Sequence, residues 1–283
     1  MDVLTVKNLS KTYPAFKLDD ISFSLEEGKI TGFIGRNGAG KTTTLRSLFD
    51  FIHADCGSVE FFGKKFRGNE NEIKKKVGFV TGGVDFYKMV KLKTISSVTK
   101  SFYDNWDDNA YAKYMKYFKL DENKSPNQLS EGMKVKYSLA LALSHRAELL
   151  ILDEPTSGLD PVSRDELLDI FMGLSEKGVT ILFSTHITSD LDKCADNIIY
   201  IKEGKIFAEA DIESFVNSYK VVKIEDENSA AKLKDKFIGL KKAKKFKTAL
   251  MKTEDAEKSG LPYENADLEN IMIHTSKEDE IDV

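Results

Sequence analysis

The sequence predicts an α/β fold with a largely parallel sheet, followed by a small α+β domain. Segments typical of strands and of helices alternate through the middle of the chain, as they do in parallel sheets. Residues 149–152 form a continuous apolar run, typical of a strand that is buried on both faces. The length of 283 residues fits one α/β domain and a small addition, because a single hydrophobic core stops growing near ~250–300 residues.

The strands are predicted from runs of β-forming residues, and the helices from apolar spacings of three and four. The expected strands are 3–6, 21–25, 29–34, 58–62, 77–80, 149–152 and 179–184, with a hairpin of 198–201 and 205–208. The expected helices are 41–51, 131–145 and 162–177. Ser130 is a good N-cap for the second of these helices. Residues 94–120 are expected to be helical, with aromatic side chains that form core packing or a partner surface.

Composition excludes several classes of protein. The chain is 41% hydrophobic and 31% charged, which excludes disordered and collagen-like proteins. A net charge of −4 argues against a nucleic-acid partner, which needs a basic surface. Cys56 and Cys194 are expected to be free thiols in a reducing compartment. The sequence contains neither a signal peptide nor an apolar run of the ~18–20 residues that span a bilayer, so we expect a cytoplasmic protein.

A phosphate-binding loop is predicted between the strand 29–34 and the helix that follows it. The pattern G-x-x-x-x-G-K-[ST] is matched in full by Gly35, Arg36, Asn37, Gly38, Ala39, Gly40, Lys41 and Thr42, and Thr43 follows it. In such a loop the backbone N–H groups and the helix N-terminus face phosphate oxygens. Lys41 is expected to reach the β- and γ-phosphates of a nucleotide, and the Thr42 hydroxyl to ligate Mg²⁺.

Two carboxylates complete this predicted site. Asp153 and Glu154 directly follow the buried strand 149–152, at the edge where open α/β sheets bind their ligands. We expect Asp153 to hold Mg²⁺, directly or through water, and Glu154 to act as the general base that polarises an attacking water.

With these two motifs the chain resembles the ATP-binding subunit of an ABC transporter. Residues 129–133 (Leu-Ser-Glu-Gly-Met) are similar to the family's signature motif, and residues 156–160, which end in Asp160, to its D-loop. His186 ends a buried strand, as the family's switch histidine does. Tyr13 lies about twenty residues before the phosphate loop, where an aromatic side chain stacks on adenine. The resemblance covers residues 2–215.

The resemblance implies the ABC-type fold of P-loop NTPases. Such a fold has a RecA-like core with a mostly parallel sheet, an antiparallel β subdomain and a helical signature subdomain, here about 85–145. The cassette would span 1–215 and an accessory domain 216–283. A weak match of residues 266–272 to the end of exporter subunits implies a bacterial exporter of the ABC-2-like type.

The resemblance also implies partners. In this family the signature residues, here Ser130 and Gly132, meet the γ-phosphate bound to a second nucleotide-binding subunit, so ATP closes a homodimer or a heterodimer. Asp160 of the D-loop is also expected to be a nucleotide-binding residue, and His186 would contact the γ-phosphate and orient Glu154. A separate transmembrane permease would carry the cargo, which places this chain peripherally at the cytoplasmic face of the membrane.

The sequence departs from the family pattern at two places. Glu131 and Met133 stand where Gly and Gln are usual in the signature. Gly82 stands where a glutamine normally senses Mg²⁺ and couples to the membrane subunit, so Asp85 or a water would have to substitute. The segment 83–95 resembles the docking site of a membrane-subunit helix, with Phe86, Tyr87, Met89 and Leu92 as apolar anchors, although packing within the chain is the alternative.

Charge divides the C-terminal region. Residues 232–252 carry nine lysines and one acid, whereas residues 253–283 carry ten acids and two lysines. This pattern is typical of a solvated, self-complementary surface, or of a basic patch that meets phosphate or anionic lipid.

Three functions remain open from the sequence. The first is an ATP-hydrolysing subunit that energises a separate membrane protein. The second is a soluble ABC ATPase that acts on nucleic acid or ribosomes, although one phosphate loop and one signature argue against it. The third is an ATP-dependent regulatory module that hydrolyses weakly, which Gly82 favours.

Overall fold

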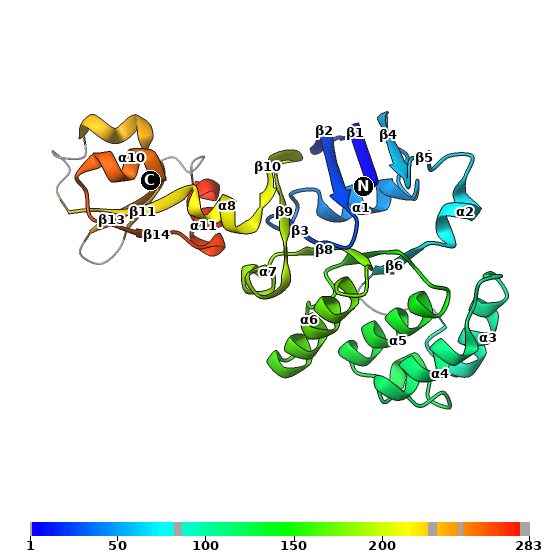
Figure 1. Ribbon diagram of the computed structural model, residues 1–283. Coiled ribbons are helices and arrows are strands. Elements are labelled where there is room, and N and C mark those ends of the chain that lie inside the picture. The colour runs from blue at the N-terminus through cyan, green and yellow to red at the C-terminus, as the bar shows by residue number, and fades with distance from the viewer. Residues whose placement is uncertain (1, 82–86, 226–230, 243–245, 278–283) are drawn as a thin grey trace. The chain divides into compact units, whose positions relative to one another are not determined.

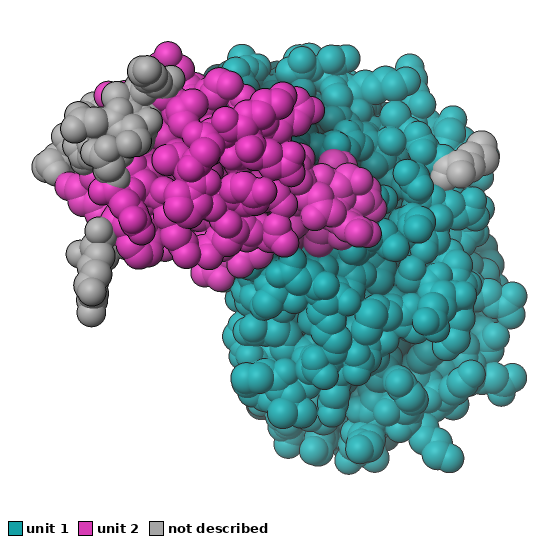
Figure 2. All heavy atoms as spheres, turned by 60° about the vertical axis from the view of Figure 1, so that its left-hand side comes forward, with its two compact units in different colours: residues 1–209 teal, residues 210–283 magenta. Residues whose placement is uncertain are grey.

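The computed structural model describes residues 2–81, 87–225, 231–242 and 246–277. These residues form two compact units, 1–209 and 210–283 (Figures 1 and 2). Within the described residues, no helix combines the length and the apolar character that are needed to cross a bilayer.

The centre of the first unit is a six-stranded sheet with the order β10-β9-β3-β8-β7-β6. Its strands are β3 (Ile30–Ile34), β6 (Val77–Thr81), β7 (Leu149–Asp153), β8 (Thr180–Thr185), β9 (Asn197–Lys202) and β10 (Lys205–Asp211). The pairs of β3 with β8 and β9, of β7 with β8 and of β6 with β7 are parallel. All five residues of β7 are buried, which confirms the strand that was predicted from the apolar run.

Helices pack on both faces of this sheet (Figure 1). The main ones are α1 (Lys41–Leu48), α5 (Glu131–Ser144), α6 (Pro161–Ser175) and α7 (Thr188–Cys194). Helix α1 ends before the predicted residue 51, because Asp50 adopts φ 59, a left-handed conformation that terminates helices. The Ser130 side chain caps α5 as predicted, since it accepts a hydrogen bond from the Met133 N–H. The short polar helix α7 was not predicted.

An antiparallel sheet covers α1 on the first unit. Its order is β2-β1-β4-β5, with β1 (Asp2–Tyr13), β2 (Phe16–Glu26), β4 (Cys56–Phe61) and β5 (Lys64–Lys65). Val6 of this sheet, Leu45 of α1 and Phe33 of β3 belong to one buried cluster. The long pairing of β1 with β2 extends both strands well beyond the predicted residues 3–6 and 21–25.

A group of helices follows β6 in the chain. It contains α3 (Leu92–Lys100), α4 (Asp108–Tyr117), a 3₁₀ turn (Pro126–Gln128) and α5, while the short α2 (Glu70–Lys74) precedes β6. The aromatic residues of 94–120 divide between the two roles that we considered. Tyr111 is buried and bonds to Ser96, whereas Phe102 and Tyr117 are exposed on the surface.

The second unit is an α+β domain around a four-stranded antiparallel sheet with the order β12-β13-β11-β14. Its elements are α8 (Ile212–Asn217), β11 (Tyr219–Ile224), a 3₁₀ helix (Ala231–Lys236), β12 (Ile238–Lys242), β13 (Lys247–Lys252), α10 (Thr253–Ser259), β14 (Tyr263–Asn265) and α11 (Leu268–Lys277). Its core includes Val222, Ala249 and Met251. Lys236 pairs with Asp255 across the boundary between the lysine-rich and the acidic blocks, as a self-complementary surface requires.

Candidate functional site

The predicted site residues gather where β3, β7 and β8 end. The parallel register places Asp153, the last residue of β7, opposite Ser184 of β8. The same register places Ile34, the last residue of β3, opposite Thr185. Because the phosphate loop follows β3 directly, the loop, the acidic pair and His186 all start from one edge of the sheet, which is the usual ligand-binding edge of an open α/β sheet.

The eight residues of the phosphate motif form one loop between β3 and α1. Gly40 caps α1 with φ 114, a conformation that favours glycine. At Gly35, an added Cβ would lie 2.4 Å from the carbonyl oxygen of Ile201, so a side chain would push the loop away from β9. The first turn of α1 directs N–H groups into the loop, because the first four N–H groups of a helix have no intrahelical acceptor.

Lys41 is buried inside this loop, at 5% exposure. Its Nζ donates to the Gly35 carbonyl at 2.7 Å and to the Arg36 carbonyl at 3.4 Å. It also lies 3.2 Å from Oε1 of Glu154. The loop therefore holds a cation at its centre, whose present partners are two neutral carbonyls and one carboxylate. Phosphate oxygens bind such a cation well and would compete with these partners for it.

A second cluster joins the loop to β7 and β8. The Thr42 hydroxyl donates to Oδ1 of Asp153 at 3.2 Å, and the Ser184 hydroxyl donates to the same oxygen at 2.7 Å. The sequence reasoning did not assign a role to Ser184. Ser184 is the polar end of the otherwise apolar strand 179–184, and this could have indicated its role. Parallel strands that end together place the polar residues at their ends side by side.

Glu154 is held by three groups. Its backbone N–H donates to the Ser184 hydroxyl at 2.9 Å, and its φ of 51 is rare for a residue with a side chain. Its Oε2 lies 2.9 Å from Nδ1 of His186, while Oε1 faces Lys41. A carboxylate that is fixed in this way beside a phosphate loop has the position that a general base for water attack needs.

Three predicted residues lie apart from this cluster. Ser130 is exposed at the start of α5, and Gly132, one residue into α5, is buried against Leu159 and Ser163. The carboxylate of Asp160 caps α6: it accepts hydrogen bonds from the N–H groups of residues 162 and 163 and from the Ser163 hydroxyl. These hydrogen bonds, the one from the Ser163 hydroxyl foremost, lower the pKa of Asp160. Within the described residues, no hydrogen bond links Ser130 or Asp160 to the phosphate loop.

Tyr13 lies at the end of β1 with its side chain partly exposed. Its ring centroid is 6.4 Å from that of Phe16. The Phe16 ring in turn reaches within 3.0 Å of the point where a Cβ on Gly40 would lie. The Phe16 ring therefore lies between Tyr13 and the phosphate loop.

The departures from the family pattern have different outcomes. Glu131 pairs with Lys134 at 2.6 Å, so its charge is balanced within α5. Gly82, Asp85 and Phe86 lie outside the described residues. Of the predicted apolar anchors, Tyr87 and Met89 are 65% and 79% exposed.

The prediction for Leu92 is wrong. Leu92 is the first residue of α3 and is fully buried, so it packs inside the chain and is not available to a docking partner. An apolar residue at the start of a helix is equally suited to the interior, and the sequence pattern did not distinguish the two.

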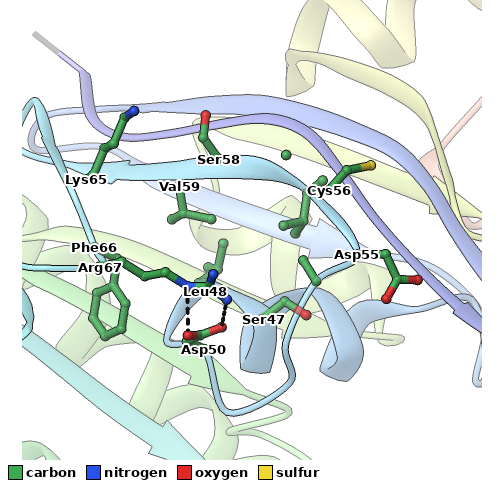
Figure 3. Close-up of a pocket in the computed structure, with 13 residues that line it drawn as sticks. Ser47, Leu48, Asp50, Asp55, Cys56, Ser58, Val59, Lys65, Phe66 and Arg67 are labelled. Carbon is green, nitrogen blue, oxygen red and sulfur yellow. Dashed lines mark hydrogen bonds and ion pairs between the residues drawn. The ribbon is translucent and has the colours of Figure 1, made fainter.

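A separate pocket of about 280 Å³ lies near the other end of α1 (Figure 3). It is lined by residues of β1, α1, β4 and β5 and of the loops beside them, and it contains none of the motif residues. Arg67 binds Asp50 with two hydrogen bonds of 2.9 and 2.8 Å, and this pairing above all lowers the pKa of Asp50 to about 2. Because these charges already neutralise each other, the pocket is a weaker candidate than the phosphate loop.

Comparison with known proteins agrees with the motifs. A family profile described as ABC transporter matches residues 18–157, a range that contains the phosphate loop and the acidic pair. The bacitracin transport ATP-binding protein BcrA of Bacillus licheniformis is 33% identical over 238 residues, which cover 82% of this chain and 78% of that protein. The chain belongs to the ATP-binding subunits of ABC transporters.

Further similarities support the assignment of this ABC subunit. The lantibiotic transport ATP-binding protein SrtF of Streptococcus pyogenes is 31% identical over 217 residues, 76% of this chain and 93% of that protein. A solved structure of the ATP-binding subunit of an ABC transporter is 26% identical to this chain, with a TM-score of 0.68. The match covers 75% of this chain and 91% of the chain in that structure. The predicted ABC-ATPase fold is confirmed, and the ABC subunit binds and hydrolyses ATP to power transport.

Proposed function

We propose that the ABC subunit hydrolyses Mg²⁺-bound ATP in sites that two subunits build together, and that closure of this dimer drives a membrane permease. The observation that supports this most strongly is the cluster of Lys41, Glu154 and His186 at the ends of β3, β7 and β8. It places the ammonium of Lys41 3.2 Å and the imidazole of His186 2.9 Å from the two oxygens of the Glu154 carboxylate.

Each residue of the cluster has a distinct role in the reaction. Lys41 and the N–H groups of residues 35–43 bind the phosphates, which positions the nucleotide and neutralises its charge. Glu154 accepts a proton from the attacking water at Oε1 or Oε2. His186 holds the Glu154 carboxylate in place through Nδ1, and Tyr13 stacks on the adenine.

The metal site fits Mg²⁺ bound together with ATP. The Thr42 hydroxyl and the Asp153 carboxylate converge on each other and offer hard oxygen ligands. Among the described residues, no group of three or more His, Cys, Asp and Glu side chains is placed to hold a metal ion. Mg²⁺ prefers such incomplete sites, where phosphates and waters supply the remaining ligands. When bound, it would neutralise charge on the phosphates.

The second subunit completes the site from the opposite side. Ser130 and Gly132 lie at the start of α5, where the helix dipole and free N–H groups favour a phosphate. Their separation from the phosphate loop within one chain supports a role in the site of a second subunit, and we place Asp160 in the same interface.

The membrane partner would bind near the exposed apolar side chains of Tyr87 and Met89. We propose that residues 1–215 form the cassette, that 216–283 form an accessory domain, and that the subunit lies at the cytoplasmic face of the membrane. Two relatives are named for the transport of bacitracin and of a lantibiotic, which supports a permease that exports compounds of this kind.

Replacing Ser130 with Asp is expected to weaken the ATP-driven association of two subunits at least tenfold, without loss of ATP binding. Aspartate caps a helix as well as serine does, so α5 is expected to remain folded. The added carboxylate would face a γ-phosphate, and two like charges about 4 Å apart repel by ~1–4 kcal/mol. The dimer is measured by light scattering with Mg-ATP in a Glu154→Gln background, which slows its dissociation.

The matched control is Ser130→Asn, a neutral N-cap of nearly the same size. It is expected to keep most of the dimer, because it adds no charge. If Ser130→Asp dimerises as well as Ser130→Asn while both bind ATP, then Ser130 does not face a phosphate and the two-subunit site is wrong.

A further inference from the structure

Three buried polar atoms without a hydrogen-bond partner belong to the segments that follow Glu154 and His186 in the chain. Within the described residues they are Thr156 Oγ1, Arg164 Nε and Asp190 Oδ2. Buried polar groups are nearly always paired, because each unpaired one costs its desolvation free energy. A group of three therefore needs an explanation.

Asp190 is the centre of this group. It is 1% exposed on α7, and its Oδ1 lies 3.9 Å from Nε of Arg164, a residue of α6. Burial raises the pKa of the Asp190 carboxyl, and the Thr156 hydroxyl and the Arg164 guanidinium beside it act in the opposite direction. One carboxylate thus lies against two other segments: the loop after β7 and the helix that begins at Asp160.

The same carboxylate lies close to the proposed catalytic pair. His186 precedes Asp190 by four residues, and the charges of His186 and Glu154 both act on the Asp190 carboxyl. Thr156 follows Glu154 by two residues. The Asp190 carboxylate therefore adjoins both the segment that follows His186 and the loop that follows Glu154.

We propose that Asp190 is a positioning residue for ATP hydrolysis, which couples the helix after Asp160 to His186 through its pairing with Arg164. This inference rests on the proposed function, in which Asp160 lies at the interface with the second subunit. An N–H···O hydrogen bond is about 2.9 Å long, so the 3.9 Å between Nε and Oδ1 would have to shorten by about 1 Å. Such a shift of α6 would pair Arg164 Nε with Asp190 Oδ1 and hold in place the segment from which His186 contacts Glu154 at 2.9 Å.

An outer pair of contacts between the same helices provides a control. Lys193 of α7 lies 2.5 Å from Asp165 and 2.7 Å from Asp169, both on α6. These exposed ion pairs also join α6 to α7, but none of them contacts the catalytic cluster. Lys193→Gln therefore tests whether any contact between the two helices is sufficient.

The test measures the kcat and KM of ATP hydrolysis and the Kd of ATP for Asp190→Asn, Arg164→Gln and the double variant. We expect each single variant to reduce kcat about tenfold, since small misplacements of a catalytic group have effects of this order, while KM and Kd change less than about twofold. The double variant is expected to be no slower than either single variant, because both remove the same link. Asp190→Glu is expected to restore most of the activity.

The proposal is overturned if Asp190→Asn and Arg164→Gln leave kcat unchanged, or if Lys193→Gln reduces kcat as much as they do. A parallel loss of ATP binding would also overturn it. Arg164→Gln keeps the test valid if Asp190→Asn does not fold, because the Arg164 side chain is 30% exposed. Glu154→Gln in the same assay separates the two claims: if Glu154→Gln is active the proposed function fails, whereas an inactive Glu154→Gln beside a normal Asp190→Asn removes only this inference.

Discussion

Replacing Glu154 with Gln is expected to reduce ATP turnover at least a hundredfold while ATP still binds. Glutamine has the same shape as glutamate but accepts protons far less readily, and general-base catalysis contributes about 10²–10⁴-fold to a rate. Binding is expected to persist because the phosphate loop is intact, and to tighten modestly because Lys41 loses a competing carboxylate at 3.2 Å. Phosphate release and the binding of a fluorescent ATP analogue measure the two quantities separately.

The control for this variant is Glu148→Gln. Glu148 directly precedes β7, at the opposite end of the strand from Glu154, and pairs with Lys76 at 3.1 Å, so it tests the loss of a glutamate that flanks the same strand. Turnover by Glu148→Gln should match the wild type. Equal turnover by Glu154→Gln and the wild type would show that another group activates the water.

Lys41→Ala is expected to weaken ATP binding by at least a hundredfold. Lys41 is the buried cation of the phosphate loop, and its removal leaves Glu154 without its charge partner beside the incoming phosphates. Charged hydrogen bonds contribute about 1.5–3 kcal/mol each, and a loss of about 3 kcal/mol corresponds to more than a hundredfold in Kd. Calorimetric titration with Mg-ATP measures the change directly.

Arg46→Ala is the matched control for Lys41→Ala. Arg46 is an exposed basic residue of the last turn of the same helix α1, so its loss lowers the net charge of the helix without changing the loop. Binding by Arg46→Ala is expected to stay within about twofold of the wild type, since exposed charges contribute little. Similar losses in both variants would mean that the loop lysine has no special role.

The sequence predicted the parts of the site that depend on local order. The phosphate motif fixes a loop between a strand and a helix, and the run 149–152 fixes a buried strand that ends in Asp153. The resemblance to the ABC family implied that His186 orients Glu154, and the structure places Nδ1 of His186 2.9 Å from Oε2 of Glu154.

The parts that sequence reasoning missed depend on contacts between distant segments. Ser184 bonds to both Asp153 and Glu154 only because of the register between β7 and β8. The sequence analysis assigned no role to Asp190, and its 1% exposure and its position beside Arg164 distinguish it only in the structure. Leu92 shows the reverse error, since an apolar residue was assigned to a docking surface although tertiary packing buries it.

The central claim is that each ATP site is built from two chains, and mixing two inactive variants tests it most directly. Lys41→Ala keeps Ser130 but does not bind ATP, whereas Ser130→Asp binds ATP but cannot complete a neighbour's site. In a mixed dimer one site has an intact loop from one chain and an intact Ser130 from the other. The account predicts that the mixture regains about a quarter to a half of wild-type turnover, because each mixed dimer has one complete site of two and the inactive variants form few dimers of their own. A mixture as inactive as either variant alone would contradict the account.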